Sequence, residues 1–186
     1  MNIWELVKCP DDMVPRPNKW VLVKKYNKAG KSIKYKARLV IKGCAQHLGF
    51  NYNQTFVPVV RIETIQAILA LVLTKDLKIQ QMDVKGAYLN GLLSEQLYMR
   101  QLKGYNDGTG HACHLIKTLY GLKQAGCKWN HKFDKQLHDK RFEWLKSNPC
   151  AYICGKTKDL SIITIWVDDL LIYWHRQNNG TSKNGP

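Results

Sequence analysis

Apolar and aromatic residues gather in two stretches near the start of the chain. Lys19–Tyr26 and Ser32–Ile41 both have the composition of strands, and Asn27–Gly30 between them has the composition of a turn. Residues 43–60 lack such a pattern, and Pro58 argues against a central strand there. We therefore expect a hairpin followed by a loop.

Two helices are expected farther along the chain. Thr64–Asp76 has apolar residues at the spacing of one helix face, and Gln124–Lys140 has them at every fourth position. The recurring residues of the second helix are Trp129, Phe133 and Leu137. We interpret them as core residues rather than as a binding stripe.

Three further stretches have the composition of strands. Leu77–Val84 follows the first helix, and Leu160–Val167 and Leu170–Trp174 lie near the end of the chain. Only Asp168 and Asp169 separate the last two, which predicts a two-residue hairpin turn made of carboxylates. Helices and strands in this order predict an α+β fold. From position 175 to 186 the chain is polar, and we expect disorder there.

Charge changes the picture more than composition does. The 186 residues, 45% of them hydrophobic, suffice for one domain or one lobe of a larger enzyme. The net charge is +15, and Lys19–Lys42 contains nine Lys or Arg and no acid. A polyanion such as nucleic acid is the natural partner of such a segment. A solvated lysine face and an anionic membrane surface are the alternatives.

The chain has no sequence feature of secretion. Its first residues lack a basic start and an apolar run, and its longest apolar stretch, residues 67–73, is too short to cross a bilayer. An intracellular protein is therefore expected. The six cysteines are scattered, which favours free thiols over disulfides, with structural zinc as the weaker alternative.

Three acidic residues depart from the apolar pattern around them. Asp168 and Asp169 are adjacent between apolar strands, where two like charges repel each other. An Asp-Asp pair is also an ordinary turn, but Asp83 at the end of another apolar strand favours a bound cation. Magnesium prefers oxygen ligands. Two such ions can activate an attacking hydroxyl and stabilise the leaving oxygen of an in-line displacement.

In this arrangement the chain resembles the reverse transcriptase of copia-type LTR retrotransposons. Asp83–Tyr88 resembles the first motif of the reverse transcriptase palm, Leu119–Ala125 the middle motif, and Trp166–Asp169 the apolar-x-Asp-Asp motif. Further phrases that are similar to this family are Tyr35–Gly43, Thr55–Arg61, Ala87–Gly91 and Leu97–Met99. The resemblance covers roughly residues 4–174, and the joint order of the motifs makes it specific.

The resemblance implies a role for each matching acid. Asp83, Asp168 and Asp169 match the catalytic residues of the family, with Asp83 and Asp168 as the expected direct ligands of two Mg²⁺ ions. The main-chain carbonyl of Val84 would complete one coordination shell. Tyr88 matches the aromatic gate that favours deoxynucleotides, although a plain core tyrosine is the alternative.

Four further residues match positions that contact the nucleotide in this family. Lys36 and Arg38 fall where the fingers contact the triphosphate, with Lys42 as an alternative, and such cations neutralise charge as pyrophosphate leaves. Lys123 and Gln124 belong to the segment that lies against the nucleotide and the template. The implied reaction is attack of a primer 3′-hydroxyl on a deoxynucleoside triphosphate.

The resemblance also implies an architecture and partners. Fingers would comprise about 4–76 and 91–118, and an antiparallel palm sheet backed by helices would comprise about 77–90 and 119–174, without a thumb. The partners would be an RNA or DNA template-primer, dNTPs and the rest of a Pol polyprotein with integrase and RNase H. The expected location is the cytoplasm, in a virus-like particle for an intact element.

Several positions depart from the family pattern. Gly126 and Cys127 stand where Pro-Arg is usual, Leu102 where a proline is usual, and Arg141 where a glycine is usual. The chain also ends soon after the Asp-Asp motif, as expected for a fragment of a decayed element. A nucleic-acid-binding remnant without polymerase activity is therefore the second hypothesis. An unrelated structural domain is the third.

Overall fold

The computed structural model describes residues 2–47, 49 and 51–175. The chain divides into two compact units, each made of two segments. The first unit comprises residues up to Val57 together with Gly86–Asp134, and the second comprises Pro58–Lys85 together with residues from Lys135 on. No helix in the described part of the chain is long and apolar enough to cross a membrane.

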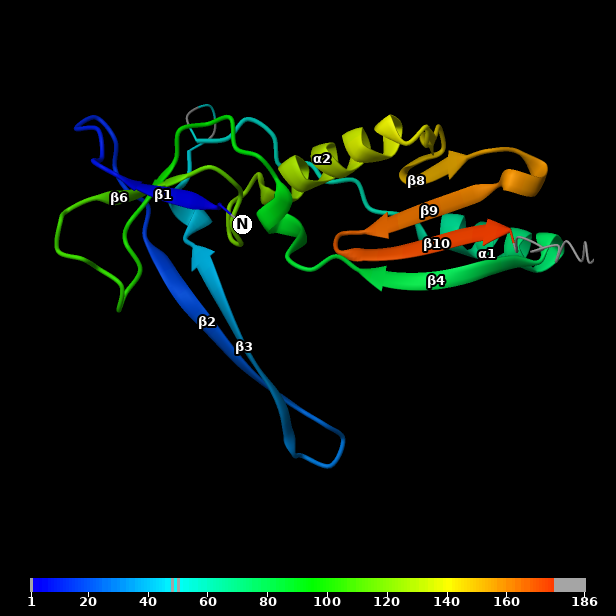
Figure 1. Ribbon diagram of the computed structural model, residues 1–186, viewed down its shortest axis with the longest axis horizontal. Coiled ribbons are helices and arrows are strands. Elements are labelled where there is room, and N and C mark those ends of the chain that lie inside the picture. Colours follow the sequence, from blue (N-terminus) through cyan, green and yellow to red (C-terminus); the bar gives the residue numbers. More distant parts are fainter. Residues whose placement is uncertain (1, 48, 50, 176–186) are drawn as a thin grey trace, which may run out of the picture. The chain divides into compact units, whose positions relative to one another are not determined.

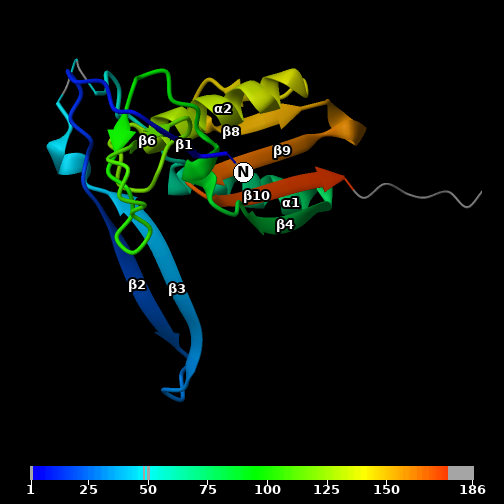
Figure 2. The same cartoon turned by 60° about the vertical axis from the view of Figure 1, so that its left-hand side comes forward.

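The first unit contains a small sheet and a long hairpin, as Figures 1 and 2 show. The sheet has the order β1-β6-β5, and all its pairings are antiparallel. The hairpin consists of β2 and β3 and extends as an arm from the rest of its unit. The elements of this unit are β1 (Trp4–Val7), β2 (Asn18–Tyr26), β3 (Ser32–Ile41), β5 (Tyr98–Met99), β6 (Ala112–Leu115) and the 3₁₀ turns Gly43–Ala45 and Ala87–Asn90.

The base of the arm is anchored in the core of the first unit, whereas its tip is exposed. Leu39 and Ile41 of β3 are buried with Leu97, Met99 and other apolar residues. Towards the tip, both strands lose this cover and most of their side chains are exposed. The burial of the base therefore holds an arm whose tip is free to contact other molecules.

The second unit is built on a five-stranded antiparallel sheet with the order β4-β10-β9-β8-β7. The helix α1 packs on one face, where Ile68 and Val72 contact a core that includes Ala151, Ile162 and Tyr173. The elements are α1 (Ile62–Lys75), β4 (Leu77–Asp83), β7 (Glu143–Leu145), β8 (Asn148–Cys154), the 3₁₀ turn Thr157–Asp159, β9 (Ser161–Trp166) and β10 (Asp169–His175). In this sheet β4 is an edge strand.

The helix α2 (Ala125–Asp139) spans the boundary between the units and ends in a Schellman motif. The N–H of Phe142 donates to the carbonyl of Leu137, and the N–H of Arg141 donates to the carbonyl of His138. Arg141 has a φ of 64°, the left-handed conformation that this motif requires. The position where the family usually has a glycine is therefore one that a glycine suits best.

The structure confirms most of the predicted elements. The hairpin and the two helices are present, and α1 begins at Ile62 rather than Thr64. The strand predicted at Leu77–Val84 is present and ends at Asp83. The side chains of Trp129, Phe133 and Leu137 are buried, as a core role requires. The result is a mixed fold of two helices and mostly antiparallel sheets.

Two predicted boundaries at the end of the chain were wrong or untested. The hairpin turn between β9 and β10 is Val167-Asp168, not Asp168-Asp169. His175 is the last residue of β10 and pairs with Leu77, so the predicted disordered tail does not begin there. The remainder of that tail lies outside the described residues. All six cysteines are free thiols.

Candidate active site

Strand pairing in the second unit brings the three acids predicted from sequence to one end of the sheet. Asp83 is the last residue of β4 and lies directly opposite Asp169, the first residue of β10. Asp168 precedes Asp169 in the turn, and its carbonyl accepts a hydrogen bond of 2.8 Å from the N–H of Val84. All three acidic side chains are exposed. We call Asp83, Asp168 and Asp169 the carboxylate triad.

The turn that carries Asp168 has an unusual backbone. Trp166 pairs with Asp169, so Val167 and Asp168 form the two-residue loop. Val167 has a φ of 60°, a left-handed conformation that is rare for a β-branched residue. Such conformations persist where surrounding structure holds them, and they are common at functional sites.

Two neighbours of the triad were not predicted from the sequence. Gln81 lies two residues before Asp83, on the same face of β4, and its Nε2 donates to Oδ1 of Asp169 over 3.4 Å. Trp166 lies opposite Asp169 on the other side and is 52% exposed. Side chains two residues apart on a strand point to the same face, so counting back two residues from Asp83 would have identified Gln81.

The donor chemistry of this region fits magnesium. Carboxylates and a main-chain carbonyl at Val84 are hard oxygen ligands, and the strand register keeps Asp83 beside Asp169. As the side chains are placed, no group of three or more His, Cys, Asp or Glu residues within the described ranges could hold a metal ion. The strand register thus places Asp83 and Asp169 next to each other, while the acidic side chains do not converge on a common point.

The five predicted nucleotide-binding residues all belong to the first unit. Two of these five, Arg38 and Tyr88, contact the ring of Tyr120. The guanidinium of Arg38 lies 5.8 Å from the ring centre of Tyr120, and Tyr120 meets Tyr88 edge-on with 5.4 Å between ring centres. Lys36 is half-buried on the same strand as Arg38. The structure thus links Arg38 to Tyr88 through Tyr120, which sequence reasoning did not single out.

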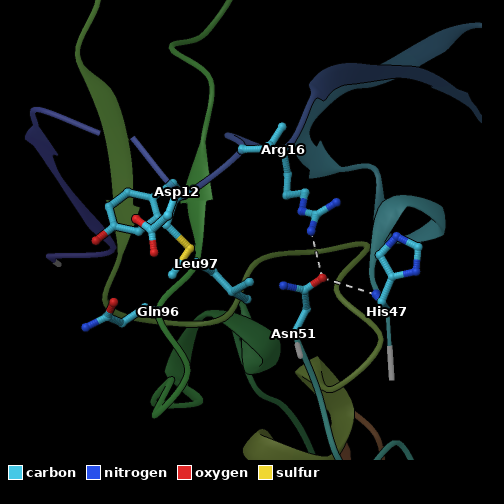
Figure 3. A pocket seen from close by; sticks show the side chains of 9 residues that line it. Asp12, Arg16, His47, Asn51, Gln96 and Leu97 are labelled. Atoms are coloured by element: carbon cyan, nitrogen blue, oxygen red, sulfur yellow. Dashed lines mark hydrogen bonds between the residues drawn. The ribbon is translucent and has the colours of Figure 1, made fainter. Parts of the chain in front are cut away.

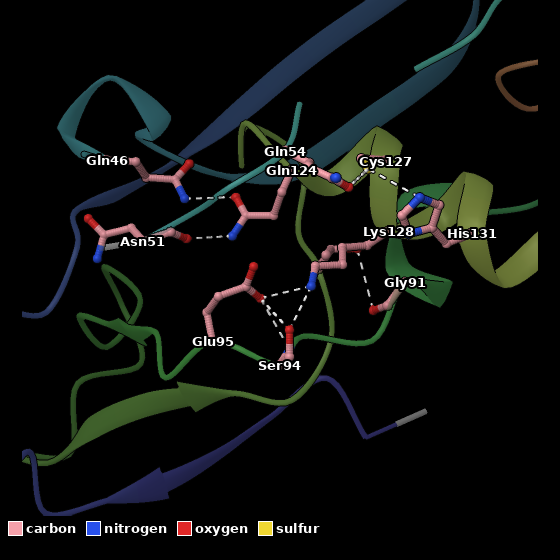
Figure 4. A network of polar contacts seen from close by, with 11 residues as sticks. Gln46, Asn51, Gln54, Gly91, Ser94, Glu95, Gln124, Cys127, Lys128 and His131 are labelled. Carbon is pink, nitrogen blue, oxygen red and sulfur yellow. Dashed lines mark hydrogen bonds and ion pairs between the residues drawn. The ribbon is translucent and has the colours of Figure 1, made fainter. Parts of the chain in front are cut away.

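Gln124 occupies the centre of a buried amide network, shown in Figure 4. Its side chain is 1% exposed; Oε1 accepts from Nε2 of Gln46 over 2.8 Å, and Nε2 donates to the carbonyl of Asn51 over 2.8 Å. The N–H of Lys123 donates to Oε1 of Gln46, and its Nζ donates to the hydroxyl of Tyr52. Gln124 therefore positions its neighbours in this structure. A direct contact with nucleotide stays a prediction.

Asn51 connects that network to a cavity of about 580 Å³ in the same unit, lined by both polar and apolar residues. As Figure 3 shows, its Oδ1 accepts from Nη2 of Arg16 over 2.7 Å and from the N–H of His47. Asp12 and Gln96 also line the cavity. Arg16 and Lys123 are thus fixed through the same short loop.

An ion pair at the start of α2 lies beside the departure at positions 126 and 127. Nζ of Lys128 is 3.1 Å from Oε2 of Glu95 (Figure 4). Burial alone would raise the pKa of the Glu95 carboxyl, but hydrogen bonds from its own backbone and from Lys128, with the charge of Lys128, lower that pKa below its usual value. Cys127, in place of the usual arginine, is buried with its Sγ 3.7 Å from Nε2 of His131.

Comparison with known proteins decides the family. The family model described as reverse transcriptase (RNA-dependent DNA polymerase) matches residues 1–179. The chain belongs to the reverse transcriptase family. The retrovirus-related Pol polyprotein from transposon TNT 1-94 of Nicotiana tabacum is 40% identical to this reverse transcriptase chain over 172 residues, which cover 91% of the chain and 13% of the polyprotein.

Two relatives from Arabidopsis thaliana support the same assignment. The retrovirus-related Pol polyproteins from transposons RE1 and RE2 are 36% and 34% identical over 174 residues, which cover 92% of this chain and 12% of each relative. The chain therefore spans about an eighth of the length of these polyproteins. The resemblance to retrotransposon reverse transcriptases, drawn above from motifs, is confirmed.

Proposed function

We propose that this chain is the nucleotidyl-transfer module of an RNA-directed DNA polymerase. The primer 3′-hydroxyl attacks the α-phosphorus of a deoxynucleoside triphosphate, and pyrophosphate leaves. The observation that carries the proposal is the pairing of Asp83 with Asp169, with Asp168 in the adjoining turn. Asp83 thereby shares one end of the sheet with Asp168 and Asp169, a pair that is remote from it in sequence.

Each part of the chain has a role in this proposal. Asp83, Asp168, Asp169 and the carbonyl of Val84 would hold two magnesium ions. Bound magnesium supplies activation of the attacking hydroxyl and stabilisation of the leaving oxygen. The five-stranded sheet acts as the core of the palm, and the β2–β3 arm belongs to the fingers.

The first unit supplies cations and an aromatic gate. Lys36 and Arg38 neutralise the triphosphate, which favours departure of pyrophosphate. Tyr88, held against Tyr120, restricts the space beside the sugar, and Lys123 contacts the nucleotide or template. The nucleic-acid partner is an RNA or DNA template-primer, and the rest of a Pol polyprotein is the protein partner.

A nucleic-acid-binding remnant without polymerase activity is the second candidate. The observation in its favour is that, within the described residues, the triad side chains do not form a metal-ligating group. The charge of the chain would still support binding, because neutralised phosphates release counterions whether or not chemistry follows.

Primer extension on an RNA template with dNTPs separates the two candidates. Under the first, extension requires magnesium, and Asp168→Asn lowers its rate by roughly a hundredfold or more while leaving template binding intact. Binding of primer–template by the unaltered chain without any extension, across a range of magnesium concentrations, would establish the second candidate instead.

Asp76→Asn is the matched control. It removes one acid of the same unit at the opposite end of β4, roughly 20 Å from Asp83 along the strand. We expect its extension rate to equal that of the unaltered chain. Equal losses in Asp76→Asn and Asp168→Asn would mean that net charge, not the triad, determines the rate.

A further inference from the structure

The register of the β2–β3 arm gives it two chemically different faces. Residues directly opposite each other in an antiparallel pair point to the same face, and the face alternates along the strand. Trp20 pairs with Leu39, and the next pair, Val21 with Arg38, points the other way. This alternation assigns each pair as far as Lys25 to one face or the other, and the register shifts between Lys25 and Tyr26.

One face carries most of the cations, and we call it the cationic face. Its pairs are Lys19 with Val40, Val21 with Arg38, Val23 with Lys36 and Lys25 with Lys34. It includes both residues proposed above to contact the triphosphate. The proposed polymerase reaction therefore uses this face.

The other face is aromatic and apolar, and we call it the aromatic face. Its pairs are Asn18 with Ile41, Trp20 with Leu39, Leu22 with Ala37 and Lys24 with Tyr35. Leu39 and Ile41 are buried at the base, whereas the outer side chains are exposed: Tyr35 is 76%, Leu22 74% and Trp20 41% exposed. A protein surface seldom exposes this many apolar side chains side by side, and such exposure indicates a binding role.

A cation lies among the aromatic rings near the tip. Nζ of Lys24 lies 5.5 Å from the ring centre of Tyr35 and 5.4 Å from that of Tyr26. Tyr35 also lines a hollow of about 280 Å³ together with Leu22, Lys24 and Ala37 of this face. Val23 and Lys36 of the cationic face line it as well. The aromatic face thus combines flat rings, a hollow beside them and a positive charge within reach.

At the base of the arm the aromatic face continues into a second hollow. Trp20 is one wall of an apolar pocket of about 320 Å³ in the same unit, and Trp4 and Tyr105 also line it. Tyr105 is largely exposed. The aromatic face therefore has Tyr35 near the tip and Trp20 at the base, where Trp20 also lines this pocket.

We propose that the aromatic face binds unpaired nucleic acid, with bases stacked on Tyr35 and Trp20 and a phosphate near Lys24. The charge of the arm selects a polyanion, since residues 19–42 hold nine Lys or Arg and no acid. Rings select a single strand, because only unpaired bases offer a free face for stacking.

Spacing supports the same choice. Successive pairs on one face of the arm repeat every two residues, which is about 6.7 Å. The pairs that contain Tyr35 and Trp20 are two repeats apart, roughly 13 Å along the arm. Stacked nucleotides of a duplex are roughly 3.4 Å apart along one strand. The aromatic face therefore suits a strand whose bases are pulled apart. The inference rests on the proposed function only for its class of partner, and it adds a second surface on the opposite side of the arm.

Anisotropy titrations of labelled oligo(dT) and of a duplex of equal length, without metal, test this inference. Tyr35→Leu removes the ring but keeps an apolar side chain, and we expect it to weaken oligo(dT) binding by roughly tenfold. Duplex binding should be unchanged, because the duplex uses cations alone. Tyr35→Phe keeps the ring and should bind oligo(dT) as the unaltered chain does.

Lys34→Gln is the control on the cationic face. It should weaken oligo(dT) and duplex binding alike and lower the slope of log affinity against log salt by about one. Tyr35 is exposed, so its variants should unfold at the temperature of the unaltered chain, which circular dichroism checks.

Three results would overturn the inference. These are unaltered oligo(dT) binding by Tyr35→Leu, an equal loss for oligo(dT) and duplex, and a changed oligomeric state with unchanged binding, which would assign the face to a protein partner. Primer extension is measured separately on the same proteins. Binding is measured without metal, so the binding result stands whether or not the same proteins extend a primer.

Discussion

A single added carbon at position 121 would collide with the main chain of β3. Gly121 has a φ of 91°, and a Cβ there would contact the carbonyl oxygen of Ile41 at closer than van der Waals distance. That carbonyl belongs to the residue whose N–H donates to Tyr120 over 2.9 Å. The middle motif and the base of the arm therefore meet only because residue 121 has no side chain.

Gly121→Ala should lower the free energy of unfolding by at least about 2 kcal/mol, since it adds left-handed strain to a backbone collision. Chemical denaturation measures this. Gly30→Ala is the control: its φ is 75°, but nothing lies within 4 Å of its added Cβ, so only about 1 kcal/mol should be lost. Equal losses would show that the collision is relieved by a shift of the chain.

At the scale of the element, the end of α2 is built for a residue other than the one it has. Arg141 adopts the left-handed conformation of the Schellman motif, which costs a residue with a side chain roughly 1–2 kcal/mol. Glycine avoids this cost, but it also gives the unfolded chain greater conformational freedom, which offsets part of the gain in stability. The arginine thus stabilises the folded state less than glycine would.

Arg141→Gly should raise the free energy of unfolding by about 0.5–1 kcal/mol, measured by urea denaturation. Arg141→Ala removes the same side chain but keeps the Cβ, so it should give no such gain. A gain of equal size in both variants would point to the charge of the arginine and not to its backbone conformation.

The sequence predicted elements of this size well because local composition determines them. The strands on either side of the arm's turn and both helices could be placed from apolar spacing alone. The turn at Val167-Asp168 was misplaced because Asp169 pairs with Trp166, a contact that composition does not reveal.

Contacts between remote residues could not be predicted from the local pattern of either residue. Gln46 and Gln124 are 78 positions apart, and neither one has a local pattern that indicates the other. The triad was found only because its acids stand in recognisable motifs. The three acids lie at one end of the sheet because of the register between β4 and β10, and the sequence alone does not reveal that register.

At the scale of the whole molecule, the five-stranded sheet has β4 as an exposed edge strand. Residues Lys78–Asp83 of β4 are exposed, and they include the apolar side chains Ile79 and Met82. An edge strand with free backbone groups and apolar side chains invites pairing with another chain. We expect the isolated chain to aggregate through this edge.

Ile79→Lys should reduce that aggregation, because a lysine on an edge strand opposes pairing. Leu73→Lys adds the same charge on α1 of the same unit, where the side chain is 84% exposed, and should have a smaller effect. Static light scattering against time at fixed concentration compares the two. A cooperative unfolding transition of a monomer in the unaltered chain would contradict the expectation.

The pairing of β4 with β10 also limits which insertions and deletions this region can tolerate. Because side chains alternate, losing one residue between Leu77 and Asp83 would turn the acid to the opposite face of the sheet. Substitutions at the exposed positions between them leave that face unchanged. The length of this strand is therefore under tighter constraint than the identity of most residues within it.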